Sequence, residues 1–526
     1  MSPVTILVVG LDGASFNLID PWLEQGLLPN FQELAATGAS GELESCIPPV
    51  TMPAWRVYST GKYPGKLGVF WHQQLDPQTW RLITPNATHF HSADLWDYLN
   101  DAGYRTGIVG MPDTYPPHPL AGFMVCAGPG AADSGYTYPE HLAEELEREV
   151  EYQPTIKSDF AEITPEGPEA KEALRVIDRT FAAAEYLLER DTVQFLQVST
   201  FDINRLQHVF FDGEPTLEAW QSVDRWLGKL TPRFDYTLIM SDHGTERLER
   251  AFFLNVWLRQ NGYLKTRFHP LDVLPRLGLN ANTVGRIMHN LGLTRLFSYE
   301  TLVKYGSMLP RSTGGFGEFG NQAMLQRLDL KRTRVVALPQ GPIYINRQNV
   351  PGKDEYERLR DELIRRLEAL TDPLTGRRVL RKVYRREEVY HGPYVEQAPD
   401  LVALDEDAYH NRAGLSQPDA FAPSWSWKGN NRHNGLFVIS GPEIQSGIRL
   451  EGVRIVDLAP TILHLCGVAV PGDMDGQVLT RAFTPESALA CQAVESQGSL
   501  QVEQETLEDE AYEEVIAERL RGLGYI

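Results

Sequence analysis

Short apolar runs alternate along the chain with stretches in which apolar residues recur at helical spacing. Each run is rich in β-branched residues and apolar almost throughout, which is typical of strands buried on both faces of a parallel sheet. The runs occupy residues 4–11, 105–111, 191–200, 236–240 and 435–441. Residues 16–38, 140–150 and 172–191 show the helical spacing. This alternation predicts an α/β fold with a mostly parallel sheet and helices on both faces.

The pattern also suggests a division of the chain. Residues 1–264 carry most of the strand and helix signals and form the first part of the predicted α/β core. Residues 265–320 are irregular and contain a Gly-rich polar stretch, so we expect an inserted cap there. Strand and helix patterns resume in residues 321–482, the predicted second part of the core. Residues 483–526 are polar and acidic, which predicts a linker that ends in a short helix at 515–526.

Composition narrows the possible partners. The chain has 526 residues and a net charge of −21, which argues against nucleic-acid binding because backbone contacts need clustered Lys and Arg. No apolar run reaches the roughly 18 residues of a membrane span, and residues 1–16 lack the basic start of a signal peptide. The scattered cysteines, without metal-ligand spacing, suit a reducing compartment. We therefore expect a cytoplasmic protein without a membrane span.

Polar side chains follow the ends of two predicted strands. Asp12 comes directly after the first strand, and Asp242 and His243 follow the strand at 236–240. In open α/β sheets, ligand-binding groups gather beyond the carboxyl ends of the strands. A carboxylate and an imidazole are ligands that divalent metals accept. An Asx turn would explain each position equally well if it stood alone.

Two further polar clusters carry weaker signals. Asn204 and His208 are four residues apart, so on a helix they share one face, and Asp202 lies just before them. His433 lies in an asparagine-rich loop that leads into the strand at 435–441. Taken alone, a histidine between apolar residues is more often a core residue, and a polar loop is more often a plain turn.

The stretch PPVTMPAW, residues 48–55, holds one hydroxyl in a stiff loop. Thr51 lies between prolines and ahead of a predicted helix, so it is a candidate helix N-cap. It is also a candidate nucleophile, because coordination to a metal lowers the pKa of a hydroxyl. The two roles are compatible, since a helix N-terminus behind the nucleophile would add amide donors for a phosphate.

The motifs together resemble the alkaline phosphatase superfamily, in its type I phosphodiesterase and nucleotide pyrophosphatase branch. The chain is similar to bacterial members described as predicted phosphohydrolases or phosphomutases. The matching stretches include VVGLDGA, PPVTMPAWRVYSTGKYPGKLGVF, NRLQHVFF, MSDHGT and NGLFVISGPEI. The resemblance implies two divalent metals, usually zinc. It assigns one metal to Asp12, Thr51, Asp242 and His243, and it implies a covalent phospho-threonine on Thr51.

The ligands of the second metal depart from the family pattern. His208 matches, but Asn204 stands where the family has an aspartate, and Asn431 stands where it has a histidine. Asp202 and His433 each lie two residues away and could substitute after a local shift. Alternatively, the second site is empty or holds a harder ion such as Mn²⁺ or Mg²⁺. As a third alternative, the protein has lost turnover and has become a binding module.

The sequence therefore predicts a metal-dependent phosphoric ester hydrolase, phosphodiesterase-like or phosphatase-like, with Zn²⁺ as the expected metal. Its expected substrate is a small phosphoester. Two alternatives stay open: a catalytically weakened protein that binds metal and phosphoester, and a transferase that passes a phosphoryl or alkyl-phosphoryl group to an acceptor. Sulfatases of the superfamily need a cysteine or serine where this chain has Thr51, so sulfate esters are less favoured. The oligomeric state and the ester class stay open.

Overall fold

The computed structural model describes residues 3–156, 164–267, 321–415, 417–424, 427–500 and 510–522. From residue 268 on, the cap expected at 265–320 lies outside these residues. Among the described helices, none has both the length and the apolar character that a membrane span requires.

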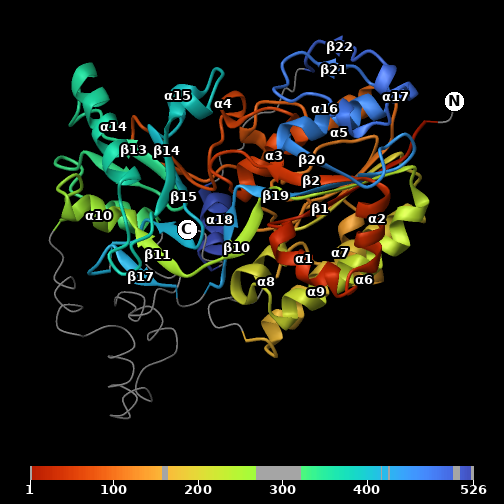
Figure 1. Ribbon diagram of the computed structural model, residues 1–526, viewed down its shortest axis with the longest axis horizontal. Helices are drawn as coiled ribbons and strands as arrows, with labels where there is room; N and C mark the ends of the chain where they lie inside the picture. The colour runs from red at the N-terminus through yellow and green to blue at the C-terminus, as the bar shows by residue number, and fades with distance from the viewer. Residues whose placement is uncertain are drawn as a thin grey trace.

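A nine-stranded sheet forms the centre of the larger part of the molecule (Figure 1). In spatial order its strands are β20 (Ile448–Arg454), β2 (Ala39–Glu44), β19 (Asn434–Ser440), β9 (Tyr236–Met240), β1 (Ile6–Leu11), β8 (Phe195–Thr200), β5 (Thr106–Val109), β6 (Gly122–Val125) and β7 (Thr137–Tyr138). The strands from β9 to β6 run parallel, whereas β19 and β7 are antiparallel to their neighbours. This mixed but mostly parallel sheet confirms the predicted α/β class.

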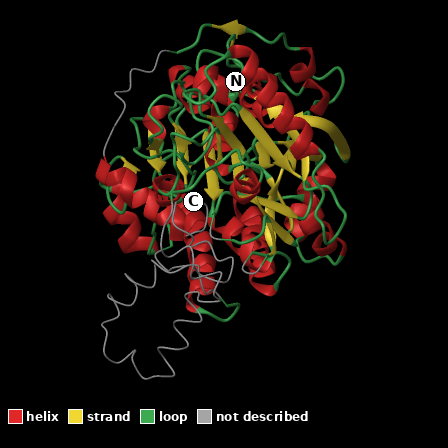
Figure 2. Cartoon of the chain, turned by 90° about the vertical axis from the view of Figure 1, so that its left-hand side faces the viewer, coloured by secondary structure: helices red, strands yellow, loops and turns green. Residues whose placement is uncertain are grey.

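Helices cover both faces of this sheet, as expected for strands that are apolar on both sides (Figures 1 and 2). One face carries α1 (Phe16–Glu24), α2 (Pro29–Thr37), α6 (Leu142–Val150), α7 (Pro168–Leu188), α8 (Asp202–Phe210) and α9 (Glu214–Leu230). The other face carries α3 (Thr51–Thr60), α5 (Leu95–Asp101) and α16 (Leu458–Leu465). Residues 16–38, which show continuous helical spacing, form two helices because Gly26 adopts a left-handed φ of 68° between them.

A second, smaller sheet lies beside the main one in Figure 1. It is antiparallel, in the order β12 (Val335–Ala337), β13 (Pro342–Ile345), β15 (Leu401–Asp405) and β14 (Leu380–Arg385), and α14 (Lys353–Glu368) packs on β14. We expected residues 321–482 to continue the core. The structure instead places 335–405 in this separate sheet, and the chain returns to the main sheet only at β19.

Short strands connect the two parts. β10 (Gly244–Arg247) pairs with β18 (Gly429–Arg432), and β11 (Arg250–Phe253) pairs with β16 (Tyr409–Arg412) and β17 (Phe421–Pro423). The C-terminal helix α18 (Glu510–Gly522) begins five residues earlier than the helix predicted at 515–526. It lies between the two parts of the molecule in Figure 1, and Ile516 and Leu520 are buried there.

Candidate functional site

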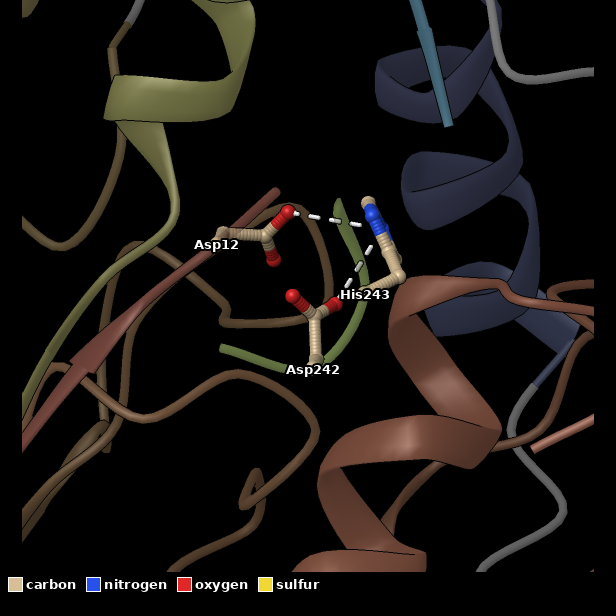
Figure 3. A group of neighbouring side chains, drawn as sticks. All are labelled: Asp12, Asp242 and His243. Atoms are coloured by element: carbon tan, nitrogen blue, oxygen red, sulfur yellow. Dashed lines mark ion pairs between the residues drawn. The ribbon is translucent and has the colours of Figure 1, made fainter. Parts of the chain in front are cut away.

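Two buried carboxylates and an imidazole meet at the carboxyl ends of adjacent strands. β1 pairs in parallel with β9, so Asp12 and Asp242 emerge side by side, and His243 follows directly. His243 Nε2 lies 3.2 Å from Asp242 Oδ2 and 3.7 Å from Asp12 Oδ1 (Figure 3). Each of the three side chains has 0% exposure. The structure thus brings together three residues that were predicted from two separate motifs.

Thr51 completes this group. It is the first residue of α3, after the N-cap Val50, so the proline-rich loop delivers its hydroxyl at a helix N-terminus. Thr51 Oγ1 lies 3.3 Å from His243 Nε2. We refer to Asp12, Thr51, Asp242 and His243 as the candidate cluster, or simply the cluster. The prediction that Thr51 is the helix N-cap is therefore wrong by one residue, because Val50 occupies that position.

The carboxylates of the cluster are costly to ionise in the absence of a cation. Burial raises the pKa of Asp12 well above its usual range, and the charge of Asp242 raises it further. Burial also raises the pKa of Asp242, although His243 and the backbone N–H of Gly13 oppose this shift. Gly13 N donates to Asp242 Oδ1 at 3.0 Å, and the other carboxylate oxygen, Oδ2, faces His243.

The donor atoms of the cluster fit a divalent cation. Nδ1 of His243 lies 3.0 Å from the carbonyl oxygen of Gly244, which can only accept, so in the neutral ring Nδ1 carries the hydrogen. The lone pair of Nε2 then faces Asp12 and Asp242. Within the described part of the chain, Asp12 Oδ1 and Asp242 Oδ2 accept no hydrogen bond. Two carboxylate oxygens and one imidazole nitrogen are a ligand set that suits zinc and related ions.

Asn204 and His208 lie on α8, next to the cluster. Asn204 Oδ1 would come within 2.2 Å of a Cβ at residue 13, so the close approach of α8 to β1 requires Gly13, whose φ is 68°. His208 Nδ1 lies 3.0 Å from Gly429 O, and the His208 ring stacks on Trp427 at 3.7 Å. Burial lowers the pKa of His208 to about 3, so the ring is neutral, as a metal ligand must be.

Asn431 reaches the cluster from the opposite side. It lies on β18 opposite Thr245, and its Nδ2 donates to Pro49 O at 3.1 Å. The same Nδ2 lies 3.1 Å from His243 Nε2. The amide nitrogen, which cannot bind a metal, therefore faces the imidazole. At this position the side chain ties the loop before Thr51 to His243.

Asp202 and His433, the possible substitutes, point elsewhere. Asp202 Oδ1 forms a buried ion pair with Arg205 at 3.2 Å. His433 lines a cavity of about 30 Å³ together with Asp405 and His410. Among the described residues, Asp12, Asp242 and His243 form the one group of at least three acidic, His or Cys side chains that could share a metal. Neither substitute joins it in this conformation.

Several residues near the cluster were not singled out from the sequence. Trp55 Nε1 donates to Asp12 Oδ2 at 3.0 Å. Arg56, on the same helix, pairs with Asp94 at 3.0 Å. Asp113 is buried with a φ of 61°, and burial raises its pKa to about 7. In the sequence, the i,i+4 spacing from Thr51 could have pointed to Trp55. The positions of Arg56 and Asp113 near the cluster depend on tertiary packing and leave no such pattern.

Helix α18 packs against residues between 115 and 133, near the cluster. Tyr512 Oη donates to Gly130 O at 2.6 Å, the Tyr512 ring stacks on Tyr115, and Arg519 pairs with Asp133 at 2.9 Å. The charge of Asp113 raises the pKa of both Tyr512 and Asp12, so Asp113 is near both groups. In Figure 3, α18 is the dark blue helix next to the three side chains.

Loosening α18 is expected to open the cluster to reagents. Thr51 is 1% exposed, so a Thr51→Cys reporter should react slowly with iodoacetamide. Tyr512→Ala combined with Arg519→Ala removes the polar contacts and the ring stack, and should speed labelling at position 51 about tenfold or more, as expected for local opening. Peptide mass spectrometry measures the rate at each cysteine.

Val515→Ala is the matched control, because Val515 lies on α18 and is largely exposed. It should leave labelling at position 51 unchanged. Labelling of Cys466, a partly buried cysteine at the end of α16, serves as an internal reference and should stay constant. If Thr51→Cys is labelled at the same rate with and without the α18 substitutions, α18 does not enclose the site.

Known proteins resemble this chain in family and in fold. The family model described as type I phosphodiesterase / nucleotide pyrophosphatase matches residues 6–420. No curated protein matches the sequence. The structure of phosphonoacetate hydrolase from Sinorhizobium meliloti 1021 superposes with a TM-score of 0.52 and 15% identity, covering 89% of this chain and 96% of that one. Human ectonucleotide pyrophosphatase / phosphodiesterase 5 gives a TM-score of 0.47 and 12% identity, covering 91% and 98%.

Proposed function

Because the chain belongs to the type I phosphodiesterase / nucleotide pyrophosphatase family, we propose that it is a metal-dependent phosphoester hydrolase with Thr51 as its nucleophile. The observation that supports this most is the position of Thr51 Oγ1, 3.3 Å from His243 Nε2 and beside two buried carboxylates. A hydroxyl held at a helix N-terminus next to a preformed ligand set is what nucleophilic catalysis requires.

The reaction divides into two displacements. Thr51 Oγ forms a bond to phosphorus while the bond from phosphorus to the leaving oxygen breaks, and the leaving alcohol takes up a proton. Water then forms a bond to phosphorus, the Thr51 Oγ–P bond breaks, and the threonine hydroxyl regains its proton. The N-terminal amides of α3 lie behind the nucleophile and favour a bound phosphate. Asn431 keeps the loop before Thr51 in place through its bond to Pro49 O.

The cation would be held by Asp12, Asp242 and His243, together with the hydroxyl oxygen of Thr51. When bound, it lowers the pKa of the threonine hydroxyl and neutralises charge that develops on the phosphoryl group. Zn²⁺ fits the imidazole ligand best, whereas Mn²⁺ and Mg²⁺ suit the oxygen ligands. The protein's own part is to orient the two carboxylates. The N–H groups of Gly13 and Trp55 each donate to one carboxylate oxygen and leave the other oxygen for the cation.

Hydrolysis of nitrophenyl esters tests the proposal. The protein is assayed with 4-nitrophenyl phosphate and bis(4-nitrophenyl) phosphate after treatment with a chelator and after addition of Zn²⁺, Mn²⁺ or Mg²⁺. We expect turnover of at least one ester that disappears with chelation and returns with one of the metals. If no ester is turned over under any condition, or if chelation has no effect, a metal-dependent hydrolase is ruled out.

A second candidate function is supported by the amides at the second metal position. Asn204 and Asn431 replace one anionic and one imidazole ligand of the family, and Asn431 turns its nitrogen toward His243. A protein with such a site would bind metal and phosphoester but turn over slowly. Metal content separates the two functions: two tightly bound ions per chain support the hydrolase, and one or none supports the weakened binding protein.

Restoring the family ligands is expected to increase activity if the second position is merely impaired. Asn204→Asp with Asn431→His adds a carboxylate and an imidazole beside His208. We expect the bound metal to rise by one ion per chain and kcat/KM to rise about tenfold or more, because a second cation stabilises the second reacting oxygen. Elemental analysis and nitrophenolate release measure the two effects. Unchanged metal content in a folded double variant would contradict this expectation.

A further inference from the structure

Trp55 joins the nucleophile helix to the first-strand carboxylate. It lies one helical turn after Thr51 on α3, at i+4, and is fully buried. Its Nε1 donates to Asp12 Oδ2 at 3.0 Å. One rigid helix therefore carries both the nucleophilic hydroxyl and the donor that holds Asp12.

The packing around the indole fixes its position. A Cβ at residue 10 would lie 2.5 Å from Trp55 Cη2, so the ring occupies space that exists only because residue 10 is glycine. Gly10 lies on β1, and Asp12 follows two residues later, directly after the strand. Tyr58 meets the ring edge-on at 6.4 Å, and its hydroxyl donates to Gln197 Oε1 at 2.7 Å on the neighbouring strand β8.

The hydrogen bond also decides which oxygen of Asp12 is available. An indole N–H is a donor only, so it occupies Oδ2 and leaves Oδ1. Oδ1 is the oxygen that lies 3.7 Å from His243 Nε2 and accepts no hydrogen bond within the described part of the chain. Groups that hydrogen-bond a ligating carboxylate orient it and typically change metal affinity by about 10–100-fold when they are lost.

We propose that Trp55 is a positioning residue of the site: its indole N–H orients Asp12 for the cation and fixes the distance between Asp12 and Thr51. This inference rests on the proposed function, because it assumes that Asp12 binds the cation. Trp55 does not touch substrate, so its loss should reduce metal affinity and kcat while it leaves KM unchanged at saturating metal.

Trp55→Phe tests the donor, because it keeps an aromatic ring and removes the N–H. Isothermal titration with Zn²⁺ should give a Kd about 10–100-fold higher than that of the wild type. With Zn²⁺ at saturation, kcat for the nitrophenyl ester should fall about tenfold, with KM within about twofold of wild type. Replacement of Trp55 by β-(benzothien-3-yl)alanine, which keeps the bicyclic shape without the N–H, should give the same losses without a cavity.

The chain offers a matched control. Trp226 Nε1 donates to Asp178 Oδ1 at 2.9 Å, a tryptophan–aspartate bond of nearly the same length on α9, away from the cluster. Trp226→Phe should leave the Zn²⁺ affinity and kcat unchanged. If it weakens Zn²⁺ binding as much as Trp55→Phe does, loss of any such bond would explain the effect, and the positioning role would be overturned.

The two readouts separate failure of this inference from failure of the proposed function. If both Trp55 variants bind Zn²⁺ as the wild type does while the wild type hydrolyses esters, the positioning role is wrong and the hydrolase stands. If both variants lose affinity but the wild type hydrolyses no ester, Trp55 positions Asp12 in a site that does not catalyse. If the wild type binds none of Zn²⁺, Mn²⁺ and Mg²⁺, both are wrong.

Discussion

Thr51→Ala should reduce phosphoester hydrolysis by at least about 10³-fold, because it removes the atom that forms the covalent bond to phosphorus in the proposed mechanism. Among the described residues, Thr51 carries the hydroxyl that lies within hydrogen-bonding distance of His243 Nε2. The helix should persist, since Val50 and not Thr51 is its N-cap. Initial rates with Zn²⁺ at saturation measure the effect, and thermal unfolding checks the fold.

Thr60→Ala is the matched control for this substitution. Thr60 ends the same helix and is equally buried, and its hydroxyl donates to Arg56 O and accepts from Lys62 N. It should keep the wild-type rate within about threefold. Thr51→Ser, which retains a hydroxyl, should recover a substantial part of the lost rate. An activity of Thr51→Ala close to that of the wild type would assign the nucleophile to another group.

Asp12→Asn should abolish metal binding and yet stabilise the metal-free protein. The wild type buries Asp12 and Asp242 next to each other, and burial with mutual repulsion raises the pKa of Asp12 well above its usual range. A neutral amide removes the repulsion, and its oxygen can still accept from Trp55. We expect the Tm of the chelator-treated variant to rise by at least about 2 °C. The wild type should be stabilised by added Zn²⁺, whereas the variant should not be.

Asp224→Asn provides the control. Asp224 is buried and accepts hydrogen bonds from the backbone of Phe31 and the side chain of Asn30, far from the cluster along the sheet. Its replacement should lower the Tm and leave the Zn²⁺-dependent rise intact. If the metal-free Asp12→Asn variant has a lower Tm than the metal-free wild type, Asp12 and Asp242 do not repel each other in the wild type.

The sequence was most informative where a local pattern determines a position. A buried parallel strand can be read from its apolar run, and the residue after it lies at the edge where ligands bind. This reasoning located Asp12, Asp242 and His243 correctly at one edge of the sheet. The family resemblance added Thr51. Its placement beside His243 in the structure agrees with that assignment, although the role of the hydroxyl remains a proposal.

Other features depend on contacts between distant segments and could not be read locally. The apolar run at 435–441 predicts a strand but not its direction, and β19 is antiparallel to β9 because the chain returns from the smaller sheet. Asp202 and His433 looked equally able to replace lost ligands. Arg205 pairs with Asp202, whereas His433 lines a cavity with Asp405 and His410, and neither outcome follows from spacing. The packing of α18 beside the cluster likewise joins residues about 400 positions apart.

The stereochemical course at phosphorus tests the central claim most directly. A chiral phosphorothioate aryl diester is hydrolysed in ¹⁸O-labelled water with Zn²⁺ present, and the configuration of the product is determined by ³¹P NMR. Attack by Thr51 followed by attack by water makes two in-line displacements, so the account predicts net retention. Net inversion would mean a single displacement by water and would contradict a covalent intermediate on Thr51.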